Sequence, residues 1–248
     1  MNMPFDNIAI LLPMRMAIIG GMCSGKSSYV LNFIRNIGDL TNIGKMGIKF
    51  DCEFYYNTIS TLKSLHDSVE NSAYFDNIKT SHGLPTKDDI ELLNNKTESN
   101  NHRLVIMEDV MYNLRSIDNK VLSKMLQMIT NSRHLNVSMI IIMHDFGFGS
   151  GVKMEFQRNF LKNSTVCVIF NNISNSVQTR NFINRLGYNY NDFLEICNIA
   201  VNIVKLDAKH GKFSQPSITI NVDVRQHFSD DLSRIIVDIF NRKLTFKM

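Results

Sequence analysis

Residues 18–30 read IIGGMCSGKSSYV, and the centre of this stretch decides the fold. Gly20, Gly25, Lys26 and Ser27 match the phosphate-loop pattern of glycine, four residues, glycine, lysine, then serine or threonine. Small residues at this spacing let successive backbone N–H groups turn toward one anion, and the N-terminus of the following helix adds partial positive charge. The pattern therefore predicts a loop that binds the phosphates of a nucleotide.

The flanks supply the strand and the helix that such a loop requires. An apolar run, 16–19, precedes it, and apolar residues at helical spacing follow it in 28–36. We expect Lys26 to face solvent until it reaches the β and γ phosphates of ATP, and the Ser27 hydroxyl to bind Mg²⁺. The predicted nucleotide-binding residues are Gly20, Gly21, Met22, Cys23, Ser24, Gly25, Lys26, Ser27 and Ser28.

Length and composition favour one domain over residues 1–248. The chain has 44% hydrophobic and 20% charged residues, which suits one substantial core. Arg15 interrupts the first apolar run and the run at 139–143 is brief, so we expect no membrane span. The four cysteines form no metal-binding cluster. A net charge of +4 permits contact with a polyanion without requiring it.

Short apolar runs alternate with helical patterns along the chain, which favours a mainly parallel sheet with helices on both faces. We expect a core over about 14–225 and a C-terminal helix over about 229–243, capped by Ser229. The segment 55–102 is polar and predicts helices and long loops. The expected strands lie near 14–19, 47–52, 103–107, 138–143, 165–170, 201–206 and 218–222, and further helices span about 119–131 and 176–186, the latter ending at Gly187.

An acidic pair follows a second buried strand. Leu104 to Met107 lead directly into Glu108 and Asp109. In phosphate-loop sites one acid holds Mg²⁺ and the next polarises the attacking water. We assign Glu108 to the metal and Asp109 to the water, although a strand end can present either residue.

The apolar strand 138–143 ends at His144. If that strand lies between the phosphate-loop strand and the acidic strand, His144 faces the γ phosphate and senses hydrolysis; the alternative is a structural histidine. A glycine-rich segment, 146–153, follows. It fits either a mobile DNA-facing loop or a surface turn with Phe146 or Phe148 in the core, and the second interpretation is favoured.

The order of these motifs resembles that of the genome-packaging ATPases of double-stranded DNA viruses and virus-like Polinton transposons, in the FtsK–HerA superfamily. The resemblance covers about 14–225. Two departures concern the sensor, where His144 replaces the usual glutamine, and the first acid, where Glu108 replaces the usual aspartate. Beyond the phosphate loop and the acids, the matching positions are Gly83–Pro85, Arg133, His134, His144, Lys153, Arg158, Val166–Phe170, Asn171, Gln178 and Arg185.

The resemblance implies a RecA/ASCE-like P-loop NTPase whose subunits form a homo-oligomeric ring and hydrolyse ATP at their interfaces. Such a ring pulls double-stranded DNA, independently of sequence, into a viral capsid and contacts capsid or portal-vertex proteins. It implies a location in the cytoplasm or nucleus of an infected cell, or in the virion. An arginine acting in trans on the neighbour's nucleotide is expected, with Arg158 preferred to Arg133.

Two other functions remain open from the residues. A small-molecule or nucleoside kinase also has a phosphate loop, and Asp51 or Glu53 would then bind the acceptor hydroxyl. A nucleotide-gated interaction protein with little turnover is the second alternative. The presence of Lys26, Ser27 and both acids argues against it, because a degenerate enzyme has no chemical need for the complete set.

Overall fold

The computed structural model describes residues 10, 12–41, 48–56, 72–95, 101–108, 118–146, 151–170, 173–174, 176–209, 217–221, 235–239 and 242–246. The strands are β1 Arg15–Ile19, β2 Phe50–Tyr56, β3 Phe75–His82, β4 His102–Met107, β5 Val137–Met143, β6 Val166–Phe170, β7 Ser217–Asn221, β8 Ile235–Ile239 and β9 Arg242–Phe246. The helices are α1 Lys26–Arg35, α2 Ile37–Leu40, α4 Lys87–Asn94, α5 Asn119–Asn131, α6 Val152–Asn163, α7 Val177–Arg185 and α8 Tyr190–Lys209.

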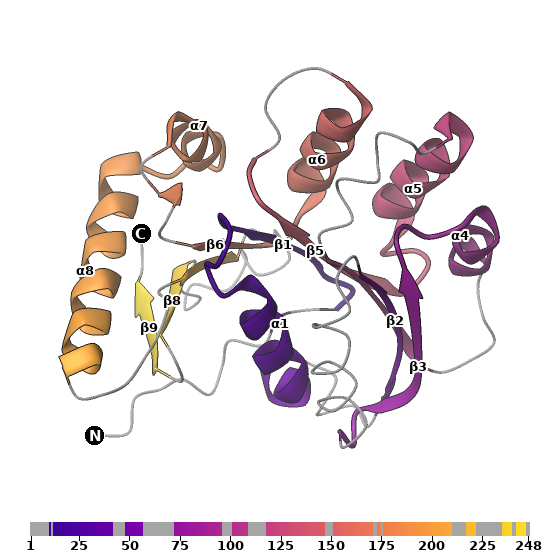
Figure 1. Cartoon of the computed structure of the whole chain (residues 1–248), viewed down its shortest axis with the longest axis horizontal. Coiled ribbons are helices and arrows are strands. Elements are labelled where there is room, and N and C mark those ends of the chain that lie inside the picture. The colour runs from indigo at the N-terminus through magenta and orange to yellow at the C-terminus, as the bar shows by residue number, and fades with distance from the viewer. Residues whose placement is uncertain are drawn as a thin grey trace.

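The strands form one nine-stranded sheet in the order β3-β2-β4-β5-β1-β6-β7-β8-β9. Pairing is parallel from β3 to β6, and β7, β8 and β9 extend the sheet with antiparallel pairing. Figure 1 shows the parallel strands side by side, with α1 on one side of the sheet and α4 to α7 on the other. The mainly parallel sheet with helices on both faces is confirmed.

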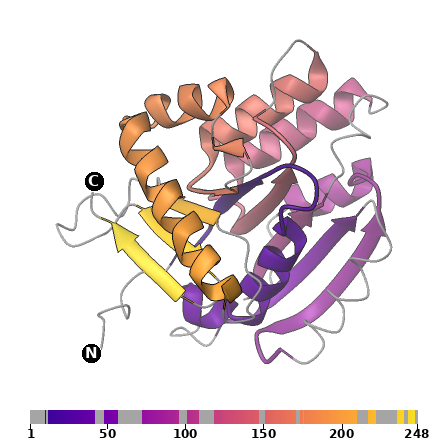
Figure 2. The same ribbon diagram turned by 60° about the vertical axis from the view of Figure 1, so that its left-hand side comes forward.

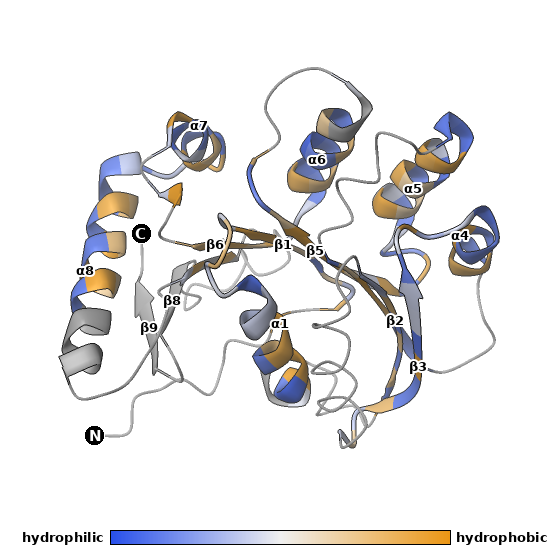
Figure 3. Ribbon diagram, viewed as in Figure 1, coloured by the Kyte–Doolittle hydropathy of each residue, from blue (hydrophilic) through white to orange (hydrophobic). Residues whose placement is uncertain are grey.

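Both faces of the central parallel strands β1, β4, β5 and β6 are buried, and each face has its own core. In β1, Ala17 and Ile19 pack with residues of α4 to α8, whereas Met16 and Ile18 pack with α1. Because successive side chains of a strand point to opposite faces, a strand buried on both sides is apolar throughout. Figure 3 shows these hydrophobic strands, with the apolar faces of the helices turned toward them.

The position of β5 identifies the class of fold. It pairs with β1, which precedes the phosphate loop, and with β4, which precedes the acids. The sensor prediction for His144 depends on this strand order, and the strand order is confirmed. The sensing role itself stays a prediction. The chain therefore has the α/β fold of a P-loop NTPase with an additional strand between the phosphate-loop strand and the acidic strand.

Three expectations about secondary structure were wrong. Residues 201–206 belong to α8 instead of a strand, and the segment expected as a C-terminal helix over 229–243 contains β8 and the start of β9. The third error concerns residues 55–102, which were expected to form only helices and long loops. This segment contains the helix α4 and also the strand β3. Figure 2 shows α8 crossing in front of β8 and β9, and the two elements α8 and β8 are in contact. No helix in the described ranges has both the length and the hydropathy of a membrane span.

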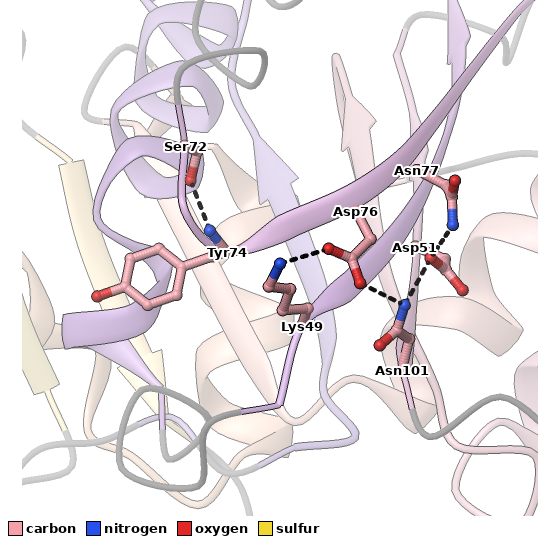
Figure 4. Close-up of polar contacts among 7 residues, drawn as sticks. All are labelled: Lys49, Asp51, Ser72, Tyr74, Asp76, Asn77 and Asn101. Carbon is pink, nitrogen blue, oxygen red and sulfur yellow. Dashed lines mark hydrogen bonds and ion pairs between the residues drawn. The ribbon is translucent and has the colours of Figure 1, made fainter.

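A polar network joins the amino ends of β2, β3 and β4 (Figure 4). Asn101 donates hydrogen bonds to Asp51, at 3.0 Å, and to Asp76, at 3.1 Å. Asn77 also donates to Asp51, and the Lys49 ammonium lies 2.6 Å from Asp76. The hydrogen bond from Lys49 lowers the pKa of Asp76. These mostly exposed contacts link three neighbouring strands and add little stability individually.

A buried histidine lies at the same amino edge. His102 is 3% exposed and its Nε2 lies 2.7 Å from the Ser138 hydroxyl, whose oxygen accepts the backbone N–H of Met14. Burial, as the main cause, lowers the pKa of His102 from 6.5 to about 4. The imidazole is therefore neutral in the folded protein at neutral pH and connects β4 to β5 without carrying charge.

This burial predicts a loss of stability in mild acid. Between pH 6.5 and about 4 the unfolded state binds a proton on His102 that the folded state does not, so the free energy of unfolding rises with pH across that window. At pH 5 the cost is about 2 kcal/mol relative to pH 7.5. Denaturant unfolding at both pH values should show this contribution in the parent and not in His102→Gln. An equal pH dependence in both proteins would contradict the account.

Candidate functional site

The carboxyl ends of three adjacent parallel strands meet at one edge of the sheet. β1 ends at Ile19 and leads into Gly20, β5 ends at Met143 and leads into His144, and β4 leads into Glu108. Ile19 pairs with Met143, and the Gly20 N–H donates to the Met143 carbonyl at 3.1 Å. The sheet therefore assembles the phosphate loop, the candidate sensor and one of the two acids at one place.

The Lys26 side chain is folded into the phosphate loop. Its ammonium donates to the carbonyls of Gly20, at 2.6 Å, and Gly21, at 2.7 Å, and lies 3.4 Å from His144 Nδ1. Lys26 is 6% exposed, so the expectation of a solvent-facing lysine was wrong. The physical reason is that an ammonium has three N–H donors and the turning loop offers backbone acceptors within reach.

The two predicted Mg²⁺ ligands are in contact. The Ser27 hydroxyl, in the first turn of α1, donates a hydrogen bond to Glu108 Oε1. Glu108 is 2% exposed, and its backbone N–H donates to the Tyr55 carbonyl at 2.9 Å, which fixes the residue beside β2. A hydroxyl and a carboxylate are oxygen donors of the kind that Mg²⁺ prefers, so this pair fits a Mg²⁺ ion bound with nucleotide phosphates.

Backbone geometry gives the loop its shape. Gly25 precedes α1 with φ 90° and Cys23 has φ 56°, two left-handed positions in one tight turn. A Cβ atom on Gly20 would lie 2.6 Å from the Ser24 hydroxyl oxygen and 2.8 Å from Phe170 Cβ. The loop thus closes against the end of β6, while the Met22 side chain at its tip is 80% exposed.

Phe170 is a site residue for which sequence reasoning gave no role. It is the last residue of β6, it is buried, and it packs against Gly20 and edge-on against the Tyr29 ring of α1. Its position was visible as the end of the apolar run 165–170. The pairing of β6 with β1, which makes this end a wall of the phosphate loop, requires the tertiary structure.

Several predicted residues lie outside the described part of the chain. These are Asp109, Asn171 and the segment 147–150, so the roles assigned to them stay predictions. In the glycine-rich segment Phe146 is buried, and its ring centroid lies 4.9 Å from that of Phe182 in α7. The expectation of an aromatic residue in the core is therefore confirmed for Phe146.

Neither candidate trans arginine lies in the loop or at the strand ends that surround Lys26. Arg133 follows α5 and precedes β5, at the amino edge, next to the Ser132 hydroxyl that accepts a hydrogen bond from Arg15 at the start of β1. Arg158 is exposed in the middle of α6, where its Nε donates to the Met154 carbonyl at 3.2 Å. The role of either arginine in trans stays a prediction.

Comparisons with known proteins give structural similarity only. No protein-family model matches the sequence, and no curated protein matches it significantly. The fold is similar to EssC (ATPases 2 and 3) of Geobacillus thermodenitrificans, with 13% identity over 72% of this chain and 36% of that chain, and a TM-score of 0.45. It is also similar to EccC (ATPases 2 and 3) of Thermomonospora curvata, with 12% identity, coverage of 64% and 30%, and a TM-score of 0.41.

This chain spans about a third of either of those proteins. The assignment of the fold therefore rests on the strand order and on the phosphate loop of this chain, and not on the strength of either match.

The close approach at Gly20 makes a specific prediction. Gly20→Ala places a Cβ against the Ser24 hydroxyl and the Phe170 side chain, so the loop must shift, and we expect ATP affinity to fall with a stability loss of about 1–3 kcal/mol. Titration calorimetry and denaturant unfolding measure the two effects.

Gly187→Ala is the matched control. Gly187 has φ 83° at the end of α7, and a Cβ there meets nothing within 4 Å. That substitution strains the backbone away from the loop and should lower stability without changing ATP affinity. Unchanged ATP affinity in Gly20→Ala would contradict the loop geometry described above.

Proposed function

We propose that this protein is an ATPase that binds MgATP at the carboxyl edge of β1, β4 and β5. The observation that carries the proposal is the contact of Ser27 with Glu108 beside a lysine already held within the phosphate loop. Lys26 and Ser27 begin α1 and Glu108 follows β4, and together they supply a cation for phosphate and oxygen ligands for Mg²⁺.

Each residue has a distinct task in this proposal. The Lys26 ammonium exchanges the Gly20 and Gly21 carbonyls for phosphate oxygens of ATP, and the loop N–H groups surround the same phosphates. Ser27 and Glu108 hold Mg²⁺, directly or through water, and the ion neutralises charge on the phosphates. Asp109, next in the chain, accepts a proton from the attacking water.

We further propose that hydrolysis drives translocation of double-stranded DNA into a viral capsid. The support is the motif order shared with the packaging ATPases, together with a net charge of +4. A motor that accepts every sequence holds DNA through phosphate contacts, so binding should weaken steeply with salt. The proposed assembly is a homo-oligomeric ring in which Arg158, or alternatively Arg133, acts on the neighbour's nucleotide.

The kinase alternative receives no support from Asp51. This residue lies at the amino end of β2, where its carboxylate accepts hydrogen bonds from Asn77 and Asn101. Lys26 and Glu108 lie at the opposite edge of the sheet. A carboxylate that binds an acceptor hydroxyl must lie beside the transferred phosphate, so Asp51 does not serve that role.

An ATPase assay with and without duplex DNA tests the proposal. The parent should hydrolyse ATP and turn over faster with DNA, and Lys26→Ala should lose a factor of about 10² or more in either condition. Lys120→Ala, an exposed lysine of α5, is the matched control and should behave as the parent. Circular dichroism of Lys26→Ala is needed as well, because this lysine also holds the loop.

The outcomes separate the candidate functions. Hydrolysis that persists near the parent rate in Lys26→Ala would contradict the active site. Turnover that ignores DNA would contradict translocation, and ATP consumption that requires a small acceptor would establish a kinase. ATP binding with background turnover in the parent would indicate the nucleotide-gated interaction protein.

A further inference from the structure

The contact between Lys26 and His144 fixes which ring nitrogen of the histidine carries the proton. A lysine ammonium has three donors and no acceptor, so in a hydrogen bond with an imidazole nitrogen the nitrogen must accept. The nitrogen that faces the ammonium is Nδ1, at 3.4 Å. In the neutral imidazole the remaining proton is then on Nε2, which lies on the far side of the ring from Lys26.

We propose that His144 is a positioning residue for Lys26 and presents an Nε2–H donor at the carboxyl edge of β5. Its Nδ1 completes the set of acceptors around the ammonium, with the carbonyls of Gly20 and Gly21. When phosphate oxygens replace those carbonyls, the contact with His144 keeps the ammonium at the same edge. The use of the Nε2–H donor toward substrate rests on the proposed function. The tautomer itself rests only on the contact between Lys26 and His144 Nδ1.

A glutamine side chain would offer the same pair of groups as this tautomer of His144. A glutamine side chain accepts through its carbonyl oxygen and donates through its amide nitrogen. An imidazole with its proton on Nε2 also offers one acceptor and one donor on a single planar group. The opposite tautomer would direct an N–H at the Lys26 ammonium and leave the far nitrogen without a proton to donate.

The chain on both sides of His144 is held in place, which supports the position of this residue beside the phosphate loop. The residue is half-buried, it follows the fully buried strand β5, and two residues later Phe146 packs against Phe182. The β5 backbone is also tied to the phosphate loop by the bond from Gly20 N–H to the Met143 carbonyl. These contacts therefore hold the backbone of His144 beside the phosphate loop, within reach of Lys26.

Nitrogen NMR of the histidine rings tests the tautomer in the full chain without nucleotide. At pH 8.5, above the usual titration range of histidine, the ring of His144 should show its proton on Nε2. In Lys26→Met this preference should decrease because the ammonium is gone, while His82, an exposed histidine at the end of β3, should not change. A proton on Nδ1 in the parent, or an unchanged preference in Lys26→Met, would overturn the proposal.

Substitution tests the positioning role. His144→Gln retains an acceptor and a donor and should stay within about threefold of the parent kcat. His144→Met, of similar size with no donor and only a weak acceptor, should lose about tenfold or more in kcat. His82→Gln is the matched control. Equal kcat in the Met and Gln variants would overturn the role. A parent without ATPase activity would contradict the proposed function, and the NMR result would still decide the tautomer.

Discussion

The parallel alignment of β4, β5 and β1 is the constraint on which the site depends. Because the three strands run the same way, the residues that follow them meet at one edge, and the chain brings Glu108, His144 and the phosphate loop together. Each strand is apolar on both faces, so its position is fixed by two cores instead of one.

The phosphate loop is held in shape by contacts within itself and with the end of β6. Gly20 has no room for a side chain beside Ser24 and Phe170, and Lys26 bonds to the carbonyls of Gly20 and Gly21. Backbone carbonyls of the loop therefore accept the hydrogen bonds of the Lys26 ammonium. In the proposed function, ATP binding would exchange these carbonyl acceptors for phosphate oxygens, and a charged phosphate oxygen is a stronger acceptor for the ammonium than a neutral carbonyl.

Much of this could be predicted from residue patterns. The phosphate loop, the acidic strand and the sensor strand are local signals, and β1, α5, β5 and α7 lie where apolar periodicity placed them. The errors have physical causes. Residues 201–206, VNIVKL, are mostly apolar, and so short a segment fits a strand or part of a helix. β3 is a polar edge strand with few apolar residues. The inward Lys26 and its contact with His144 depend on tertiary distances that no spacing records.

In the proposed function, Ser27 and Glu108 together would hold the Mg²⁺ of bound ATP. Titration calorimetry of ATP with Mg²⁺, and with Mg²⁺ removed by EDTA, tests this most directly. In the parent, Mg²⁺ should raise the ATP affinity by about tenfold or more, equivalent to about 1.4 kcal/mol. In Glu108→Gln, which keeps the shape and removes the charge, that gain should disappear. An equal gain in Glu108→Gln, or an absence of ATP binding by the parent, would contradict the account.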